Sequence, residues 1–142
     1  LLTSSAASDV YKRQIYCDGA SRSNPGDASI GVSINKDKVE IDTIKKKIGI
    51  NTNNVAEYLG LIAALEYCVE NKVNNVRIFL DSLLVVQQVN MEYKVKSKKL
   101  QAHYEKSLKL INQIEDIEIH HIRREFNSRA DQLANEALDE IW

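Results

Sequence analysis

Four acidic residues are placed where this sequence changes from one kind of segment to another. Asp18 closes the apolar run 14–18, and Asp81 directly follows the apolar run 76–80. Glu57 and Asp131 fall near the starts of two segments with helical periodicity. Four carboxylates gathered at one point would raise one another's pKa unless cations neutralised them. Oxygen ligands without His or Cys favour magnesium or manganese over zinc, and two such ions about 3.5–4 Å apart suit in-line attack on a phosphodiester.

Each of these acids also has a simpler explanation when it is taken alone. Asp18 can be a turn residue at a strand end, and Asp81 can belong to an ordinary strand-to-helix turn. Glu57 lies on the apolar face of its segment, where a cation would compensate it or a helix N-terminus would stabilise it. Asp131 follows Ser128 by three residues, which is the spacing of a capping box. The prediction of a metal site therefore depends on all four acids together.

The elements that must position these acids follow one another in a definite order. Alternation of apolar and small residues predicts three strands at the start, and helical spacing with short apolar runs predicts the rest. The strands are expected over 14–18, 28–35, 39–50, 76–80 and 117–122, and the helices over 54–72, 83–90, 98–113 and 128–141. Asp37-Lys38 is the expected hairpin turn, and Thr52 or Asn53 the expected N-cap of the first helix. This order predicts an α/β fold: a five-stranded mixed sheet, three antiparallel strands and then parallel ones, with helices on both faces.

Length, composition and charge exclude several classes of protein. The chain has 142 residues, of which 44% are hydrophobic, and a formal net charge of −1. One domain of this size folds without disulfides or metal, and the charge balance excludes a uniformly polybasic binder. No apolar run approaches the roughly 18 residues of a membrane span. Cys17 and Cys68 are too far apart for a zinc site, so we expect buried thiols, a cytoplasmic location and no obligate protein partner.

The first residues differ in character from the rest of the chain. Residues 1–13 begin without Met, contain a Ser- and Ala-rich run, and lack the basic and apolar regions of a secretory signal. We therefore expect residues 1–13 to be a non-native or truncated leader, followed by one domain over 14–142. Residues 11–14 can still extend the first strand.

Four motifs, in order along the chain, resemble those of ribonuclease H of type 1. The motifs are DGASRSNPG at 18–26, TNNVAE at 52–57, DS at 81–82 before LVVQ at 84–87, and NSRADQLANEAL at 127–138. Together they extend over residues 14–141. The short segment before the last acid is similar to that of the compact archaeal and Gram-positive-type branch of the family.

This resemblance implies a ribonuclease H-like fold and a metal-dependent endonuclease. By the same resemblance, Asp18, Glu57, Asp81 and Asp131 are the metal-binding catalytic acids. The family hydrolyses the RNA strand of RNA–DNA hybrids with two Mg²⁺ ions, for which Mn²⁺ can substitute, and leaves 5′-phosphate and 3′-hydroxyl ends. One ion orients the attacking water, and the other stabilises the departing 3′-oxygen.

The resemblance also implies which residues contact the hybrid duplex. Asn24, Asn54 and Gln87 match positions at the minor groove, where 2′-hydroxyls distinguish RNA from DNA. Thr52 matches a position that touches a DNA phosphate, and Asn53 lies between these contacts. Simple helix capping is the alternative explanation for Thr52 and Asn53.

Two features depart from the pattern of many family members. The segment 122–127 is short and lacks the His that assists product release elsewhere in the family, so Glu125 and Asn127 are the candidate auxiliary residues there. Arg123 and Arg124, like Arg129, either meet the substrate strand or pair with carboxylates.

The second departure is a short segment where some members have a basic protrusion. Residues 94–109 nevertheless carry six lysines against one glutamate. Such a stretch neutralises phosphates or is a solvated helix face.

Two other functions remain open at this point. Another nuclease or transferase on the same fold would use the same acids, but the Asn-Pro-Gly and Thr-Asn-Asn motifs concern hybrid recognition. A catalytically silent module that binds hybrids or double-stranded RNA has little reason to keep four acids near phosphates.

Overall fold

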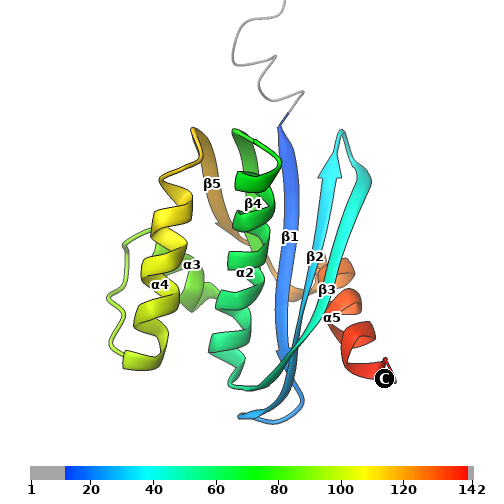
Figure 1. The fold of residues 1–142 in the computed structure, drawn as a ribbon, viewed down its shortest axis with the longest axis vertical. Coiled ribbons are helices and arrows are strands. Elements are labelled where there is room, and N and C mark those ends of the chain that lie inside the picture. Colours follow the sequence, from blue (N-terminus) through cyan, green and yellow to red (C-terminus); the bar gives the residue numbers. More distant parts are fainter. Residues whose placement is uncertain (1–11, 141–142) are drawn as a thin grey trace, which may run out of the picture.

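The computed structural model describes residues 12–140, which form one five-stranded sheet with the strand order β3-β2-β1-β4-β5 (Figure 1). The first three strands pair antiparallel, and β4 joins β1 and β5 in parallel. The strands are β1 (Arg13–Ser21), β2 (Gly26–Lys36), β3 (Val39–Asn51), β4 (Asn75–Leu80) and β5 (Asp116–His121). The predicted mixed sheet is confirmed.

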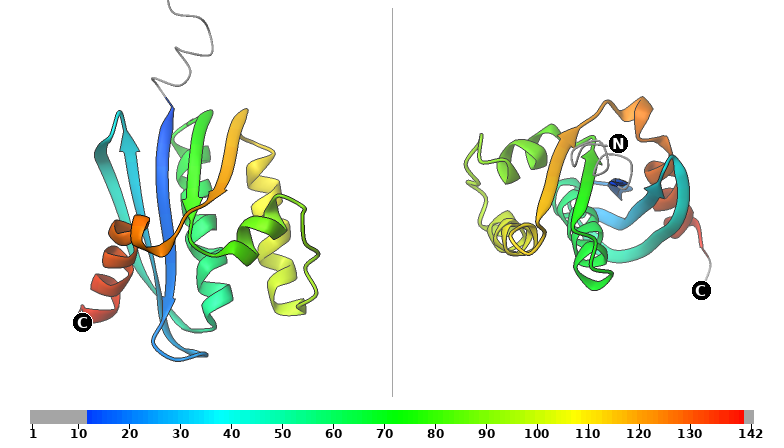
Figure 2. Two further views of the ribbon diagram at one scale, coloured as in Figure 1. Left: turned by 180° about the vertical axis from the view of Figure 1, so that it is seen from behind. Right: turned by 90° about the horizontal axis from the view of Figure 1, so that it is seen from above.

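Helices cover both faces of this sheet, as predicted (Figure 2). They are α2 (Asn53–Glu70), α3 (Leu83–Val89), α4 (Lys98–Ile111) and α5 (Ser128–Asp139). Helix α2 packs on β1 with α4 beside it, whereas α5 packs on the opposite face against β2, β1 and β3. A single 3₁₀ turn over Arg124–Phe126 (η1) was not predicted, because three residues are too short to show a periodicity.

Local side-chain chemistry explains where several elements begin and end. Asp37 and Lys38 have positive φ angles of 52° and 65° and join β2 to β3, as a tight hairpin turn requires. Thr52 caps α2, because its hydroxyl accepts a hydrogen bond from the Val55 amide at 3.3 Å. Ser82 caps α3 in the same way through Val85.

The capping box expected at 128–131 is not formed. Helix α5 begins one residue earlier than that spacing requires, with Asn127 at the N-cap position and Ser128 as the first helical residue. The side chain of Asn127 makes no capping hydrogen bond. A capping box therefore does not explain Asp131, although Asp131 does lie in the first turn of α5, where a negative charge supports a helix start.

The core lies mainly between the sheet and α2. The predicted buried face of α2 is confirmed, since Leu61, Ala64, Leu65 and Cys68 are all inaccessible to solvent. Cys17 lies opposite them on β1, and both cysteines are buried free thiols, as expected. Within residues 12–140, no helix is both long and apolar enough to cross a membrane.

The start of the described chain belongs to the folded domain. Arg13 is the first residue of β1, and Lys12 is only 6% exposed and donates a hydrogen bond to Glu118 on β5 at 3.0 Å. The first strand thus extends into the segment 11–14, as the sequence allowed. The expected leader falls largely on residues 1–11, outside the described residues, and stays a prediction.

Candidate active site

The first pair of acids is brought together by a close contact between β1 and α2. Asp18 lies in β1 and is 6% exposed, and Glu57 lies in the second turn of α2 and is 9% exposed. A Cβ atom on Gly19 would lie 2.1 Å from the carbonyl carbon and oxygen of Ala56. Only glycine therefore allows the helix to approach β1 at this point, which holds Glu57 beside Asp18.

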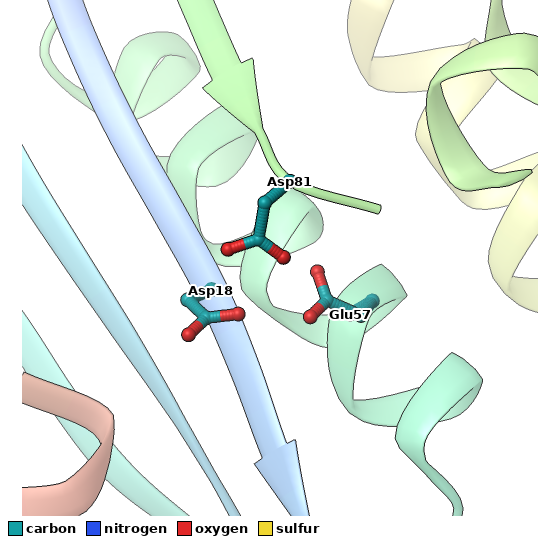
Figure 3. A group of neighbouring side chains, drawn as sticks. All are labelled: Asp18, Glu57 and Asp81. Atoms are coloured by element: carbon teal, nitrogen blue, oxygen red, sulfur yellow. The ribbon is translucent and has the colours of Figure 1, made fainter. Parts of the chain in front are cut away.

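Asp81 completes a group of three carboxylates at the end of β4. One oxygen from each of Asp18, Glu57 and Asp81 lies within 4.8 Å of the others. Figure 3 shows the three side chains pointing toward one another from β1, α2 and the residue that follows β4. These acids line an open cleft of about 450 Å³. The structure thus brings together three of the four predicted acids as one potential metal-binding group.

The fourth acid, Asp131, reaches the same cleft from α5 on the opposite face of the sheet. It lines the cleft with the other three and is close enough to affect the pKa of Asp18. A second close approach permits this, because a Cβ atom on Gly31 of β2 would lie 2.2 Å from the Ala130 carbonyl oxygen. Gly31 is the β-ladder partner of Asp18, so the helix that carries Asp131 rests directly beside Asp18.

An ion pair fixes the first turn of α5. The Arg129 guanidinium donates to both carboxylate oxygens of Glu40 on β3, at 2.9 and 3.0 Å. Ser33 on β2 donates to the same carboxylate at 2.8 Å. Bidentate pairing of this kind is strongly directional. Arg129 is therefore held by a carboxylate, which is one of the two roles considered for the arginines of this region.

Burial and mutual repulsion dominate the electrostatics of the acid cluster. Burial, with the charges of Asp81 and Asp131, raises the pKa of Asp18 from 3.8 to about 7. Burial and the Asp18 carboxylate raise the pKa of Glu57 well above its ordinary value. Such shifts arise when carboxylates share a site that lacks a compensating cation. The arrangement is thus costly for the protein alone and is relieved by a bound cation.

The donor set fits a hard divalent cation. The Glu57 Oε2 atom is buried and makes no hydrogen bond within the described chain, and a buried carboxylate oxygen without a partner is costly. The carboxylates of Asp18 and Asp81 converge with that of Glu57, and carboxylate oxygens are the ligands of Mg²⁺ and Mn²⁺. A divalent cation bound among these oxygens would satisfy the unpaired Glu57 oxygen and offset the repulsion between the acids, so the residues fit the kind of metal that the sequence predicted.

The predicted hybrid contacts from the first two motifs gather at one side of the cleft. Asn53 and Asn54, at the start of α2, both line it. Asn24 lies beside them, because its Oδ1 accepts a hydrogen bond from the Asn53 amide at 3.1 Å. Thr52 is engaged in capping, the alternative that the sequence left open. A phosphate contact of Thr52 remains a prediction.

The two glutamines of α3 lie in different surroundings, and the predicted contact of Gln87 with the hybrid stays a prediction. Gln87 is half-buried and does not line the cleft, whereas Gln88 is buried and accepts a hydrogen bond from the Tyr58 hydroxyl at 2.5 Å. Gln88 lines a neighbouring hollow of about 520 Å³ together with Asn54. Sequence reasoning did not single out Gln88. The sequence feature that could have identified Gln88 is its position four residues after Leu84, because this spacing places a polar side chain on the apolar face of a helix.

The charged residues around η1 differ in whether they reach the acid cleft. Arg124 lines the acid cleft, whereas Arg123 and Glu125 are exposed, pair with each other at 3.8 Å and lie outside the cleft lining. Asn127 is 1% exposed and donates through Nδ2 to Asp81 at 3.0 Å. Of the two candidate auxiliary residues, Asn127 therefore contacts the acid cluster and Glu125 does not line its cleft.

Comparison with known proteins identifies the family of this fold and site. A family model described as reverse transcriptase-like matches residues 16–137. Ribonuclease HI of Halobacterium salinarum is 39% identical over 126 residues, which cover 88% of this chain and 63% of that protein. The crystal structure of ribonuclease H1 from the same archaeon has a TM-score of 0.88 and 37% identity, and the match covers 92% of this chain and 99% of that one. The chain belongs to the ribonuclease H type 1 family.

Two further matches show the range of proteins in which this ribonuclease H domain is found. A structure of LC11-RNase H1 in complex with an RNA/DNA hybrid is 39% identical, with a TM-score of 0.84 and coverage of 90% of this chain and 97% of that one. A protein of Mycobacterium tuberculosis named as bifunctional is 39% identical over 127 residues. These residues cover 88% of this chain but only 35% of the mycobacterial protein, so the chain spans about a third of that relative.

Proposed function

We propose that this chain is a metal-dependent endoribonuclease that hydrolyses the RNA strand of RNA–DNA hybrids and leaves 5′-phosphate and 3′-hydroxyl ends. Two Mg²⁺ ions, replaceable by Mn²⁺, are its proposed cofactors, and a hybrid duplex is its proposed substrate. The observation that carries the proposal is the convergence of Asp18, Glu57 and Asp81 within 4.8 Å, with Asp131 lining the same cleft. Relatives named as ribonuclease H and a relative's complex with a hybrid support the substrate class.

The four acids would hold the ions, and each comes from a different element. Divalent ions held by these acids would supply positive charge that could activate a water molecule and stabilise a departing oxygen. The chain itself supplies fixed carboxylate oxygens in a partly buried cleft, so that little reorganisation is needed when substrate arrives. Arg124 lines the same cleft and adds a permanent positive charge that suits a phosphate of the cleaved strand.

Selectivity for a hybrid is assigned to the polar residues at the start of α2. Asn53 and Asn54 present amide groups at the cleft, and Asn24 is tied to them through the Asn53 backbone. Amide side chains both donate and accept hydrogen bonds, which is what reading a 2′-hydroxyl from the minor groove requires. Gln87, Thr52 and Arg123 are the further proposed contacts. A cytoplasmic location, which two free buried thiols suit, is part of the proposal.

The experiment is cleavage of an end-labelled RNA–DNA hybrid in Mg²⁺, with RNA–RNA and DNA–DNA duplexes of the same sequence as controls. We expect the hybrid alone to be cut, and the products to carry 3′-hydroxyl and 5′-phosphate ends. Asp18→Asn should lower the rate at least about 10³-fold, because removing a single group of a cooperating catalytic set costs a large share of the rate.

Other outcomes would point to the alternative functions. Cleavage of all three duplexes would favour another nuclease on this fold. A folded wild-type protein that binds the hybrid but cuts nothing in either Mg²⁺ or Mn²⁺ would favour a silent binding module.

A further inference from the structure

Asn127 occupies a helix N-cap position but does not act as a cap. Asparagine is favoured at N-caps because its side-chain oxygen accepts a hydrogen bond from the second or third helical amide. In α5 this bond is absent, and the side chain is 1% exposed and turned toward the acid cluster. Local rules broken in this way commonly mark a residue that serves a functional site.

The side-chain amide of Asn127 joins three of the elements that carry the acids. Its Nδ2 donates to the backbone carbonyl of Cys17, the residue before Asp18, at 3.0 Å. The same nitrogen donates to the Asp81 carboxylate oxygen Oδ2 at 3.0 Å. Asn127 itself is followed four residues later by Asp131, whose amide bonds to the Asn127 carbonyl at 3.1 Å. Both Nδ2 protons are thereby used, one toward β1 and one toward the end of β4.

We propose that Asn127 is a positioning residue, which orients the Asp81 carboxylate and sets the relative placement of β1, β4 and α5 for metal binding. The inference rests on the proposed function only in assuming that the acids bind metal. The Asp81 carboxylate that accepts this bond also places one of its oxygens within 4.8 Å of a carboxylate oxygen of Asp18 and one of Glu57 (Figure 3). A group that orients a ligand in this way commonly changes metal affinity or activity about 10–100-fold when it is removed.

The test uses Asn127→Ser, because serine is also a good N-cap but is too short to span the two contacts of the amide. We expect the apparent dissociation constant for Mn²⁺, measured by calorimetry without nucleic acid, to rise about tenfold or more. In hybrid cleavage, half-maximal activity should need a correspondingly higher Mg²⁺ concentration. The KM for the hybrid should stay within about twofold of wild type, because Asn127 is only 1% exposed and so offers almost no surface to a substrate.

Asn90→Ala is the matched control. Asn90 ends α3, and its Nδ2 donates to the Ile119 carbonyl at 3.0 Å, so it too ties a helix end to a strand but touches none of the acids. It should bind Mn²⁺ as the wild type does, with thermal melts showing that both variants are folded at the assay temperature. Wild-type Mn²⁺ affinity in folded Asn127→Ser, or an equal loss in Asn90→Ala, would overturn the proposal. Failure of the proposed nuclease function would appear separately, as a wild-type protein that binds Mn²⁺ but cuts no hybrid.

Discussion

At the scale of single residues, the pKa of Asp18 shows most clearly the free-energy cost of placing four acids close together. Its pKa is raised from 3.8 to about 7, first by burial and then by the charges of Asp81 and Asp131. Glu57, its neighbour in α2, is shifted in the same direction. Buried like charges of this kind are a burden on the folded state that a bound cation removes. The site is therefore expected to trade stability for function.

This cost predicts how the stability of the metal-free protein depends on pH. Between about pH 4 and 7 the folded protein binds a proton at Asp18 that the unfolded chain releases, so the free energy of unfolding falls as the pH rises through this window. For a carboxyl shifted from 3.8 to about 7, the loss approaches about 4 kcal/mol above pH 7. Asp18→Asn should make the profile less steep, with a residual slope from the raised pKa of buried Glu57, and it should be more stable than wild type at pH 8 in EDTA.

Urea unfolding in EDTA between pH 5 and 8 measures this effect. Hydrogen bonds from Lys12 and His120 lower the pKa of Glu118 to about 2. The effect of Glu118 on the pH dependence of stability therefore falls below pH 5, outside the measured range. Burial lowers the pKa of His103, which gives a slope of opposite sign that is common to both proteins and cancels in their difference. Parallel profiles for wild type and Asp18→Asn would contradict the prediction. Saturating Mg²⁺ should stabilise the wild type and not the variant.

At the scale of elements, the active site depends on how closely α5 packs on β2. Gly31→Ala would place a Cβ atom 2.2 Å from the Ala130 carbonyl oxygen, so α5 and the Asp131 that it carries must move. Overpacking of this kind costs about 1–3 kcal/mol, and we expect hybrid cleavage to fall more than stability alone explains. Unfolding and cleavage measurements on the same preparation check this.

Gly49→Ala is the control for the glycine substitution. Among residues 12–140, no atom lies within 4 Å of a Cβ atom built on Gly49, but the φ of 76° makes a side chain unfavourable there. It should lose about 1–2 kcal/mol through backbone conformation alone and keep the activity of the folded fraction. Equal activity of folded Gly31→Ala and Gly49→Ala would show that the approach of α5 does not matter for the site.

Element positions were predictable from sequence to the extent that they depend on local periodicity. The alternation in β2 and the face of α2 marked by Leu61 and Cys68 gave the order of the elements. The four acids could be named from the sequence, but the expected end of the first strand at Asp18 was wrong, because β1 continues to Ser21 and Asp18 lies within it. The close contacts at Gly19 and Gly31 could not be foreseen, because they arise between segments that are distant in the sequence. The same holds for the pairing of Arg129 with Glu40 and for the turn of Asn127 away from its helix. The periodicity of a segment indicates which of its faces is buried, but it does not indicate which other segments pack against that face.

At the scale of the whole molecule, the net charge of −1 conceals two regions of opposite sign. The acid cluster occupies the cleft, and the lysines of 94–109 lie on α4 and the loop before it. The structure places three of these lysines in two different hollows. Lys94 and Lys96 line the hollow that Asn54 shares with the acid cleft. Lys106 pairs with Glu66 at 3.7 Å and lines a different hollow, between α2 and β2–β3.

This division predicts which lysines bind the phosphates of a hybrid. The double variant Lys94→Ala/Lys96→Ala should weaken hybrid binding and reduce the slope of log affinity against log salt by roughly 1–2, since each phosphate contact contributes about 0.9 in duplex DNA. Lys106→Ala removes one positive charge from a different hollow and should leave the slope unchanged. Fluorescence anisotropy between 50 and 200 mM salt, a range over which such contacts have large effects, measures the slopes in an Asp18→Asn background that does not consume the hybrid. Equal slopes for the double variant and Lys106→Ala would mean that the phosphates pass elsewhere, and that the basic stretch is only a solvated face of the protein.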